Sequence, residues 1–183
     1  SNYLKKNLKD LPQISVVVGH DCRNNSRLFA ETSANIFSAN GIKVYLFDDM
    51  RPTPEMSFAI RHLGCQSGII LTASHNPKQW NALKLLNEKG EFLNKEEGNE
   101  VLRIAEAEEF NFAEVDKLGS YRKDLTYNTK HIDSVLALDL VDVDAIKKAD
   151  FRVAIDCVNS VGGIILPELL ERLGVKHVEK LYC

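Results

Sequence analysis

The chain alternates short apolar runs with longer segments whose apolar residues recur at helical spacing. Three runs, at 14–19, 42–47 and 68–71, are rich in Ile, Val and Leu and have the length of buried strands. Residues 26–40 and 53–64 lie between these runs and follow a helical period, each with a glycine at or just after its end. Strands that alternate with helices in this way predict an α/β fold, with a largely parallel sheet and helices on both faces.

The same periodicity predicts which side chains of the two helices face the sheet. For 26–40 the expected inward residues are Phe29, Ile36, Phe37 and Asn40. For 53–64 they are Met56, Ala59, Ile60 and Leu63, spaced i, i+3, i+4 and i+7.

The second half of the chain predicts further elements and then a restart of the α/β pattern. Residues 82–86 indicate another strand, 94–109 an acidic helix with a solvated face, and 129–140 a helix that turns Ile132, Val135, Leu136 and Leu140 inward. From about residue 150 a strand, a glycine-bearing turn, a helix and a further strand follow one another. We therefore predict one domain at 1–149 and the truncated beginning of a second at 150–183, since a single βαβ unit leaves a sheet edge unpaired.

Composition excludes several classes of protein. The 23 basic and 26 acidic residues give a net charge of −3, without a Lys/Arg block, so neither nucleic acid nor an anionic membrane is an expected partner. No apolar run approaches the length needed to span a membrane. The four cysteines are scattered and include no C-x-x-C pair, which favours reduced thiols in the cytoplasm over a disulfide framework or a zinc site.

Candidate chemistry is concentrated in the segment Thr72–Pro77, which follows the third predicted strand. It presents Ser74, His75 and Asn76 in succession, and Asn81 and Lys84 come shortly after. In a parallel sheet, this segment and 19–24 both open on the edge formed by the strands' carboxyl ends, where ligands bind. A hydroxyl, an imidazole, an amide and an ammonium group suit phosphate transfer. The alternatives are an ordinary polar loop and a serine hydrolase; the absence of a G-x-S-x-G elbow argues against the latter.

The hexapeptide Thr72–Pro77, followed by the Asn-x-x-Lys pattern of Asn81 and Lys84, resembles the active-site signature of the α-D-phosphohexomutases. Three further stretches are similar to segments of that family, and the resemblance extends from about residue 14 to 174. They are Val18–Arg23 (family V-G-R-D-x-R), Arg51–Pro54 (the turn before a helix) and Asp156–Gly163 (family D-x-x-N-G-x-G-G).

The resemblance implies the fold of phosphohexomutase domain I, a mixed and mainly parallel sheet between helices, plus the start of domain II. It also implies that Ser74 is phosphorylated and exchanges phosphate with a hexose phosphate through a hexose 1,6-bisphosphate, the intermediate and activator. A Mg²⁺ ion would bind the Ser74 phosphate together with an aspartate-rich loop. Lys84 would act as general base with His75 near the phosphate, and Arg23, Asn76 and Asn81 would be adjacent to substrate or phosphate.

The sequence also departs from the family pattern. His20, Ala82 and Ser160 replace an arginine and two glycines, and the D-G-D-x-D metal loop, the sugar-selecting loop and the C-terminal phosphate loop do not occur. We therefore expect no mutase activity from this polypeptide alone. Glucose, mannose and glucosamine phosphates all remain open as substrates. The alternative function is a non-catalytic phosphate-binding or interaction domain.

Overall fold

A computed structural model describes residues 1–183 and contains two sheets. The larger sheet has five strands, in the spatial order β4-β3-β1-β2-β5, and only β4 runs antiparallel to its neighbour. Its strands are β1 (Ser15–His20), β2 (Lys43–Phe47), β3 (Ser67–Leu71), β4 (Leu83–Leu86) and β5 (Tyr121–Asp124). The smaller sheet pairs β6 (Arg152–Asp156) with β7 (His177–Leu181) in parallel. The predicted mixed, mainly parallel α/β fold is confirmed.

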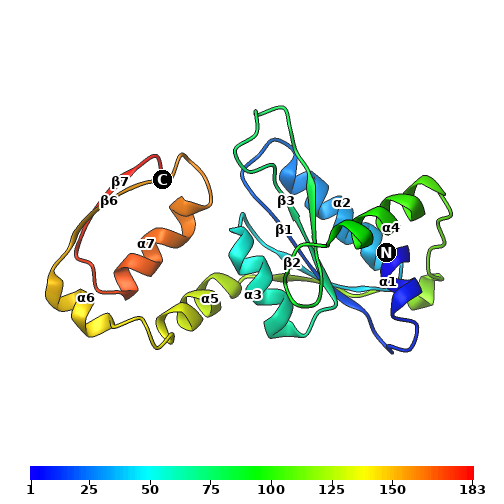
Figure 1. The fold of residues 1–183 in the computed structure, drawn as a ribbon, viewed down its shortest axis with the longest axis horizontal. Helices are drawn as coiled ribbons and strands as arrows, with labels where there is room; N and C mark the ends of the chain where they lie inside the picture. The colour runs from blue at the N-terminus through cyan, green and yellow to red at the C-terminus, as the bar shows by residue number, and fades with distance from the viewer.

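Seven α-helices and one short 3₁₀ helix accompany the sheets, and α2 and α3 lie on opposite sides of the larger one (Figure 1). The helices are α1 (Asn2–Asn7), α2 (Ser26–Ala39), α3 (Thr53–Leu63), α4 (Lys95–Glu106), α5 (Tyr127–Leu136), α6 (Val143–Ala149) and α7 (Gly162–Arg172), with the 3₁₀ helix at Val115–Lys117. None of these helices has the length and hydropathy required to cross a bilayer.

Two apolar cores form because successive side chains of a strand point to opposite faces. Val16 and Val18 of β1 join the core under α2, whereas Val17 joins the core under α3. All three valines are fully buried. This explains why the strand at 15–20 is a continuous apolar run instead of an alternating one.

The inward face predicted for α2 is wrong in part. Phe29 and Ile36 are exposed, whereas the helix buries Ser26, Ala30, Ala34 and Phe37. Small side chains bring the helix close to the sheet, so the buried stripe follows the alanines and not the largest residues. Helix α5 ends at Leu136, so Leu140, which was predicted to face inward from this helix, lies outside it and is 98% exposed.

Strand β5 was not predicted because its sequence, Tyr-Arg-Lys-Asp, has no apolar alternation. It pairs only with β2 and exposes three of its four residues, as an edge strand can. Asp124, its one buried residue, accepts hydrogen bonds from the backbone N–H and hydroxyl of Thr126, at 2.9 and 2.7 Å. β5 thereby leads directly into α5.

The second unit, β6–α7–β7, is connected to the first through α5 and α6 and lies to one side of it in Figure 1. Three polar contacts link α5 to α7, one of them a 3.3 Å hydrogen bond from the Thr129 hydroxyl to the Glu168 carboxylate. The Asn128 amide donates to the Glu168 carboxylate at 2.6 Å, and Arg172 forms an ion pair with Asp133. The boundary at 149/150 stays a prediction.

Candidate functional site

The two predicted loops meet at the carboxyl edge of the larger sheet. β1 and β3 are parallel neighbours with His20 opposite Leu71, so the residues that follow each strand emerge side by side. The Asp21 N–H donates to the Leu71 carbonyl at 3.1 Å, and the Thr72 hydroxyl donates to the Asp21 carboxylate at 2.6 Å. The expectation that both loops open on one edge is confirmed.

Ser74 occupies an unusual backbone conformation at the tip of the second loop. Its φ of 52° lies in the left-handed region, which costs a residue with a Cβ about 1–2 kcal/mol. The Thr72 hydroxyl accepts a hydrogen bond from the Ser74 N–H at 3.1 Å and helps to hold this turn. The Ser74 side chain is exposed, with Oγ 3.3 Å from Nδ1 of His75. The turn therefore projects the hydroxyl away from the sheet and toward solvent.

Arg23 holds the Ser74 loop through backbone carbonyls. Its Nη2 donates to the carbonyls of Ser74 and Asn76, both at 2.5 Å, and its Nη1 donates to those of Pro77 and Trp80, at 3.0 and 3.1 Å. Only 12% of the Arg23 side chain is exposed. In this arrangement both terminal nitrogens point at the loop backbone, so the geometry gives Arg23 a role in shaping the loop.

A polar network behind the loop includes Asn81. The Asp21 carboxylate accepts hydrogen bonds from the Arg23 N–H at 2.9 Å and from the Ser26 hydroxyl at 2.8 Å, in addition to the one from Thr72. The Asn81 amide donates to the Ser26 hydroxyl at 2.8 Å and to the Asn24 carbonyl at 3.1 Å. Asn81 thus ties the end of the Ser74 loop to the loop that follows β1. Its proposed place next to phosphate stays a prediction.

A cleft of about 400 Å³ lies in front of Ser74, between the two units. Its lining combines polar residues of both loops with two residues of the second unit: Asp21, Cys22, Arg23, Asn24, Ser74, Asn76, Lys78, Val158 and Ser160. Cys22 Sγ lies 3.1 Å from Ser160 Oγ across the cleft. Lys78 provides a cation that sequence reasoning missed, although its position directly after Pro77 was a signal that a basic residue belongs to the loop.

The structure places the other predicted residues at different distances from the cleft. His75 is exposed beside Ser74, and its role near the phosphate stays a prediction. Lys84 lies on β4 opposite Ile70, one residue pair further from the Ser74 loop than the pair Leu71–Leu83. Its Nζ is 5.6 Å from the centroid of the Phe92 ring. Its role as a base stays a prediction. His20 is buried at the end of β1, and its Nδ1 lies 2.9 Å from the Asp21 carbonyl oxygen.

One carboxylate, that of Asp21, lines the cleft in front of Ser74. No group of three or more His, Cys, Asp and Glu side chains is positioned to hold a metal ion. The Asp21 carboxylate near Ser74 already accepts three hydrogen bonds, so it is committed to the loop network.

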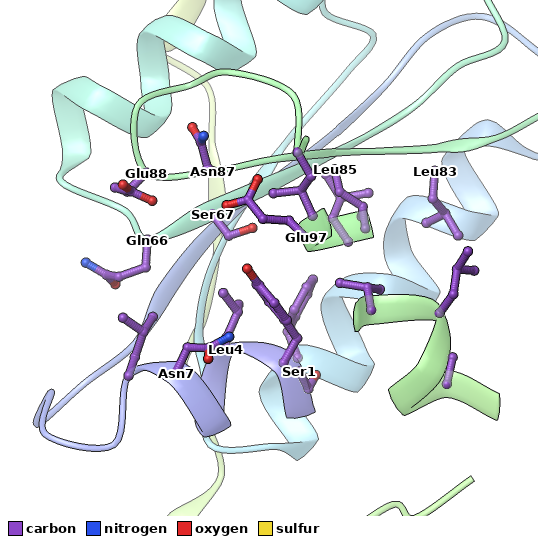
Figure 2. Close-up of a pocket in the computed structure, with 18 residues that line it drawn as sticks. Ser1, Leu4, Asn7, Gln66, Ser67, Leu83, Leu85, Asn87, Glu88 and Glu97 are labelled. Atoms are coloured by element: carbon purple, nitrogen blue, oxygen red, sulfur yellow. The ribbon is translucent and has the colours of Figure 1, made fainter. Parts of the chain in front are cut away.

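A larger cavity, of about 630 Å³, lies away from this cleft, between α1, α4 and the strands β3 and β4 (Figure 2). Leu83 and Leu85 of β4 line one side, and Val101 and Leu102 of α4 line another. No residue of the Ser74 loop contributes to it. The acidic helix α4 therefore has an apolar side, in addition to the solvated face expected from its charge.

A buried Arg–Glu contact lies near the same edge of the sheet and joins the turn after β2 to the first turn of α3. Glu55 is fully buried, with one carboxylate oxygen 3.1 Å from Nε of Arg51, and Arg51 also donates to Asp48 at 2.7 Å. Burial raises the pKa of the Glu55 carboxyl from 4.5 to about 7, against the opposing charge of Arg51. The Arg51 N–H donates to the His20 carbonyl at 2.9 Å, which connects this turn to the end of β1.

We expect Glu55 to make stability depend on pH. Between pH 4.5 and 7 the unfolded carboxyl is ionised while the folded one keeps its proton, so rising pH favours unfolding. At about 1.4 kcal/mol per pKa unit, the free energy of unfolding should fall by about 3 kcal/mol across this range. Urea unfolding at several pH values measures this. Glu55→Gln should flatten the fall, whereas the exposed control Glu91→Gln should keep it; an equal fall in both variants would contradict the assignment.

Comparison with known proteins gives matches to both units. The family profile described as "Phosphoglucomutase/phosphomannomutase, alpha/beta/alpha domain I" matches residues 1–112. The profile described as "Phosphoglucomutase/phosphomannomutase, alpha/beta/alpha domain II" matches residues 129–182.

Individual relatives agree with these matches. The chain is 32% identical, over 88% of its length, to a phosphoglucosamine/phosphogalactosamine mutase from Sulfurisphaera tokodaii, and 34% identical, over 89%, to a phosphoglucomutase/phosphomannomutase from Thermococcus kodakarensis. The crystal structure of a putative phosphomannomutase from Thermus thermophilus superposes with a TM-score of 0.77 at 27% identity, covering 98% of the chain and 39% of that structure. The chain spans about a third of the length of these curated relatives, 35% in both cases.

Proposed function

Since this chain belongs to the phosphoglucomutase/phosphomannomutase family, we propose that it provides the phosphate-carrying serine, Ser74, of a phosphohexomutase. The exposed Ser74 hydroxyl, projected into the cleft by a left-handed turn, is the observation on which this proposal rests. A nucleophile whose strained backbone conformation is held by several surrounding contacts is typical of functional sites. Here two sets of hydrogen bonds hold that conformation. One is the set that Arg23 donates to the loop carbonyls, which we call the Arg23 clamp, and the other is the bond that the Thr72 hydroxyl accepts from the Ser74 N–H.

In the proposed reaction, the Ser74 oxygen attacks the phosphorus of a hexose 1,6-bisphosphate. A bond forms between Ser74 Oγ and phosphorus as the bond from phosphorus to the sugar oxygen breaks. The hydroxyl proton of Ser74 passes to that leaving oxygen, and His75 Nδ1, 3.3 Å from Oγ, is placed to relay it. This step completes a cycle. Phosphorylated Ser74 first gives its phosphoryl group to the free hydroxyl of a hexose monophosphate, the resulting bisphosphate turns round, and Ser74 then takes the other phosphoryl group by the step just described. The net result moves phosphate between positions 1 and 6 of the sugar.

Other groups of the chain assist this transfer in the proposal. Lys78 lines the cleft, where its ammonium group neutralises charge on the phosphate. Asn76 is beside it in the cleft and offers an amide donor. Lys84 is the proposed base for the attacking sugar hydroxyl, and its side chain must swing away from the Phe92 ring to act there. A Mg²⁺ ion, when bound, withdraws charge from the phosphoryl group; in this chain only the Ser74 phosphate would contact it.

The proposed substrates are hexose phosphates, and the proposed location of the reaction is the cytoplasm. The relatives named above are mutases of glucosamine, galactosamine, glucose and mannose phosphates, which makes a phosphorylated hexose the shared chemistry. We propose that parts of a longer protein outside these 183 residues select the sugar and complete the metal site. Residues 1–183 alone are then expected to interconvert no glucose 1- and 6-phosphate.

Intact-mass measurement of the longer protein that contains these residues, after incubation with glucose 1,6-bisphosphate and Mg²⁺, tests this function. The expected result is one phosphoryl group on Ser74, absent from the matched variant Ser74→Ala and retained in Ser67→Ala, a serine of β3 outside the cleft. Binding of hexose phosphate without any transfer to Ser74 would instead favour the non-catalytic phosphate-binding domain. Labelling of Ser74 by a fluorophosphonate probe would indicate a serine hydrolase and contradict the proposal.

A further inference from the structure

Two cysteines lie at the carboxyl ends of the paired strands β6 and β7. The parallel register places Asp156 opposite Leu181, so Cys157 and Cys183 both follow the last residue pair of this sheet. They share one backbone oxygen. The Cys157 N–H donates to the Leu181 carbonyl at 3.1 Å, and the Cys183 thiol donates to the same carbonyl at 3.5 Å. The strand pairing therefore brings the two residues to the same end of this sheet.

The start of α7 leaves room for both cysteines. A Cβ on Gly162 would lie 3.5 Å from both Cβ and Sγ of Cys157, and a Cβ on Gly163 would lie 3.1 Å from Cα of Cys183. A side chain on either glycine would thus occupy or narrow the space around the thiols. The consecutive glycines allow the helix to begin directly against the cysteine pair.

The two thiols differ in accessibility. Cys157 is buried, at 4% exposure, whereas Cys183 is exposed. Burial raises the pKa of the Cys157 thiol, and the neighbouring Cys183 thiol raises it further. An exposed thiol reacts first with a soluble oxidant, and a buried thiol at the same end of the sheet is placed to react second.

We propose that Cys157 and Cys183 are a modification site: a thiol pair that forms a reversible disulfide when the protein meets a peroxide. The Cys183 thiolate attacks hydrogen peroxide, giving a sulfenic acid and hydroxide. The Cys157 sulfur then attacks the sulfenic sulfur, and its proton leaves with the displaced hydroxide as water. In total, two thiols and one peroxide become one disulfide and two waters, and a thiol reductant reverses the change.

The remaining groups near the pair fit this inference better than metal binding. Zinc sites require four protein ligands, or three with a water, and no third His, Cys, Asp or Glu completes a set with these two sulfurs. The other two cysteines are elsewhere. Cys65 is buried in the first unit against the Ser15 hydroxyl, and Cys22 contacts Ser160 in the cleft.

The cross-link would also affect the candidate site. The loop after Cys157 contains Val158 and Asn159, both with positive φ, and the Asn159 N–H donates to the Tyr182 carbonyl at 2.6 Å. The next residue, Ser160, lines the cleft in front of Ser74. A disulfide at Cys157 would therefore fix the part of the second unit that faces the Ser74 loop.

Thiol mapping of residues 1–183 tests the proposal. The protein is treated with hydrogen peroxide, its free thiols are blocked, and its peptides are analysed by mass spectrometry with and without reduction. The expected product is a Cys157–Cys183 cross-linked peptide that disappears on reduction, so that two of the four thiols are lost. Cys183→Ser should abolish the cross-link, and the matched control Cys65→Ser should retain it.

Two results would overturn the inference. One is over-oxidation of Cys183 to sulfinic acid while Cys157 stays free, and the other is a cross-link that uses Cys22. The mapping of the unmodified chain decides between these outcomes even if a variant fails to fold. It also does not depend on the phosphorylation of Ser74, so it stands or falls separately from the proposed function.

Discussion

Arg23→Met is expected to slow the phosphorylation of Ser74 about 100-fold and to lower the free energy of unfolding by about 3 kcal/mol. The guanidinium group donates four hydrogen bonds to carbonyl oxygens of residues 74–80, and it is mostly shielded from water. Methionine fills a similar volume but donates nothing. The loop would then lose the contacts that compensate the left-handed conformation of Ser74, and the hydroxyl would leave its productive position.

A second substitution separates charge from shape. Arg23→Lys keeps the positive charge, but a single ammonium group cannot span carbonyls that the planar guanidinium reaches with two nitrogens. We expect it to behave closer to Arg23→Met than to the unmodified chain. Arg27→Met is the matched control, because Arg27 is an exposed arginine of α2 whose ion pair with Glu31 contributes little.

The measurements are the rate of Ser74 phosphorylation by hexose bisphosphate, urea unfolding, and hydrogen exchange of residues 74–80. Exchange in this loop should accelerate in Arg23→Met and remain unchanged in Arg27→Met. If Arg23→Met were phosphorylated at the unmodified rate with a well-protected loop, the clamp would not be what positions Ser74.

Gly119→Ala is expected to destabilise the protein by about 4 kcal/mol or more, because the new methyl group would collide with backbone atoms. A Cβ at this position would lie 2.0 Å from the Ile42 carbonyl oxygen and 2.5 Å from its carbon. Backbone atoms next to a sheet strand cannot move aside as a flexible side chain can. Gly119 is also held from both sides by Ser38, whose carbonyl accepts from its N–H at 2.7 Å and whose hydroxyl donates to its carbonyl at 2.6 Å.

The consequence of this substitution should extend beyond the glycine. Gly119 leads into β5, which leads into α5 and so to the second unit. Gly98→Ala in α4 is the control, since a Cβ there meets no atom within 4 Å and alanine favours the helix, which should add about 0.5–1 kcal/mol of stability. Thermal and urea unfolding of both variants test the pair. Equal stability of Gly119→Ala and the unmodified chain would show that the contact between residue 119 and the Ile42 backbone can relax.

Much of the fold was predictable because its central strands are buried on both faces. β1 and β3 bury all but one of their residues and β2 buries three of five, so each appears in the sequence as a short apolar run. An edge strand lacks that constraint, which is why Tyr121–Asp124 was not recognised before its pairing with β2 was seen. The face of α2 was mispredicted for a related reason: the contact with the sheet depends on how closely the helix approaches, and alanine allows the closest approach.

The sequence by itself determined that a serine-bearing loop follows a central strand and shares a sheet edge with the loop after β1. This holds because parallel strands joined by right-handed crossovers must bring their carboxyl ends to one side. Only the tertiary structure decided which groups the neighbouring residues contact there. Arg23 donates to four backbone carbonyls of residues 74–80, and its place next to phosphate stays a prediction. Likewise Cys157 and Cys183, 26 positions apart in a sequence with no cysteine motif, became a pair through the register of β6 and β7. Such roles depend on where backbone oxygens and strand ends lie in space, which the order of residues does not state.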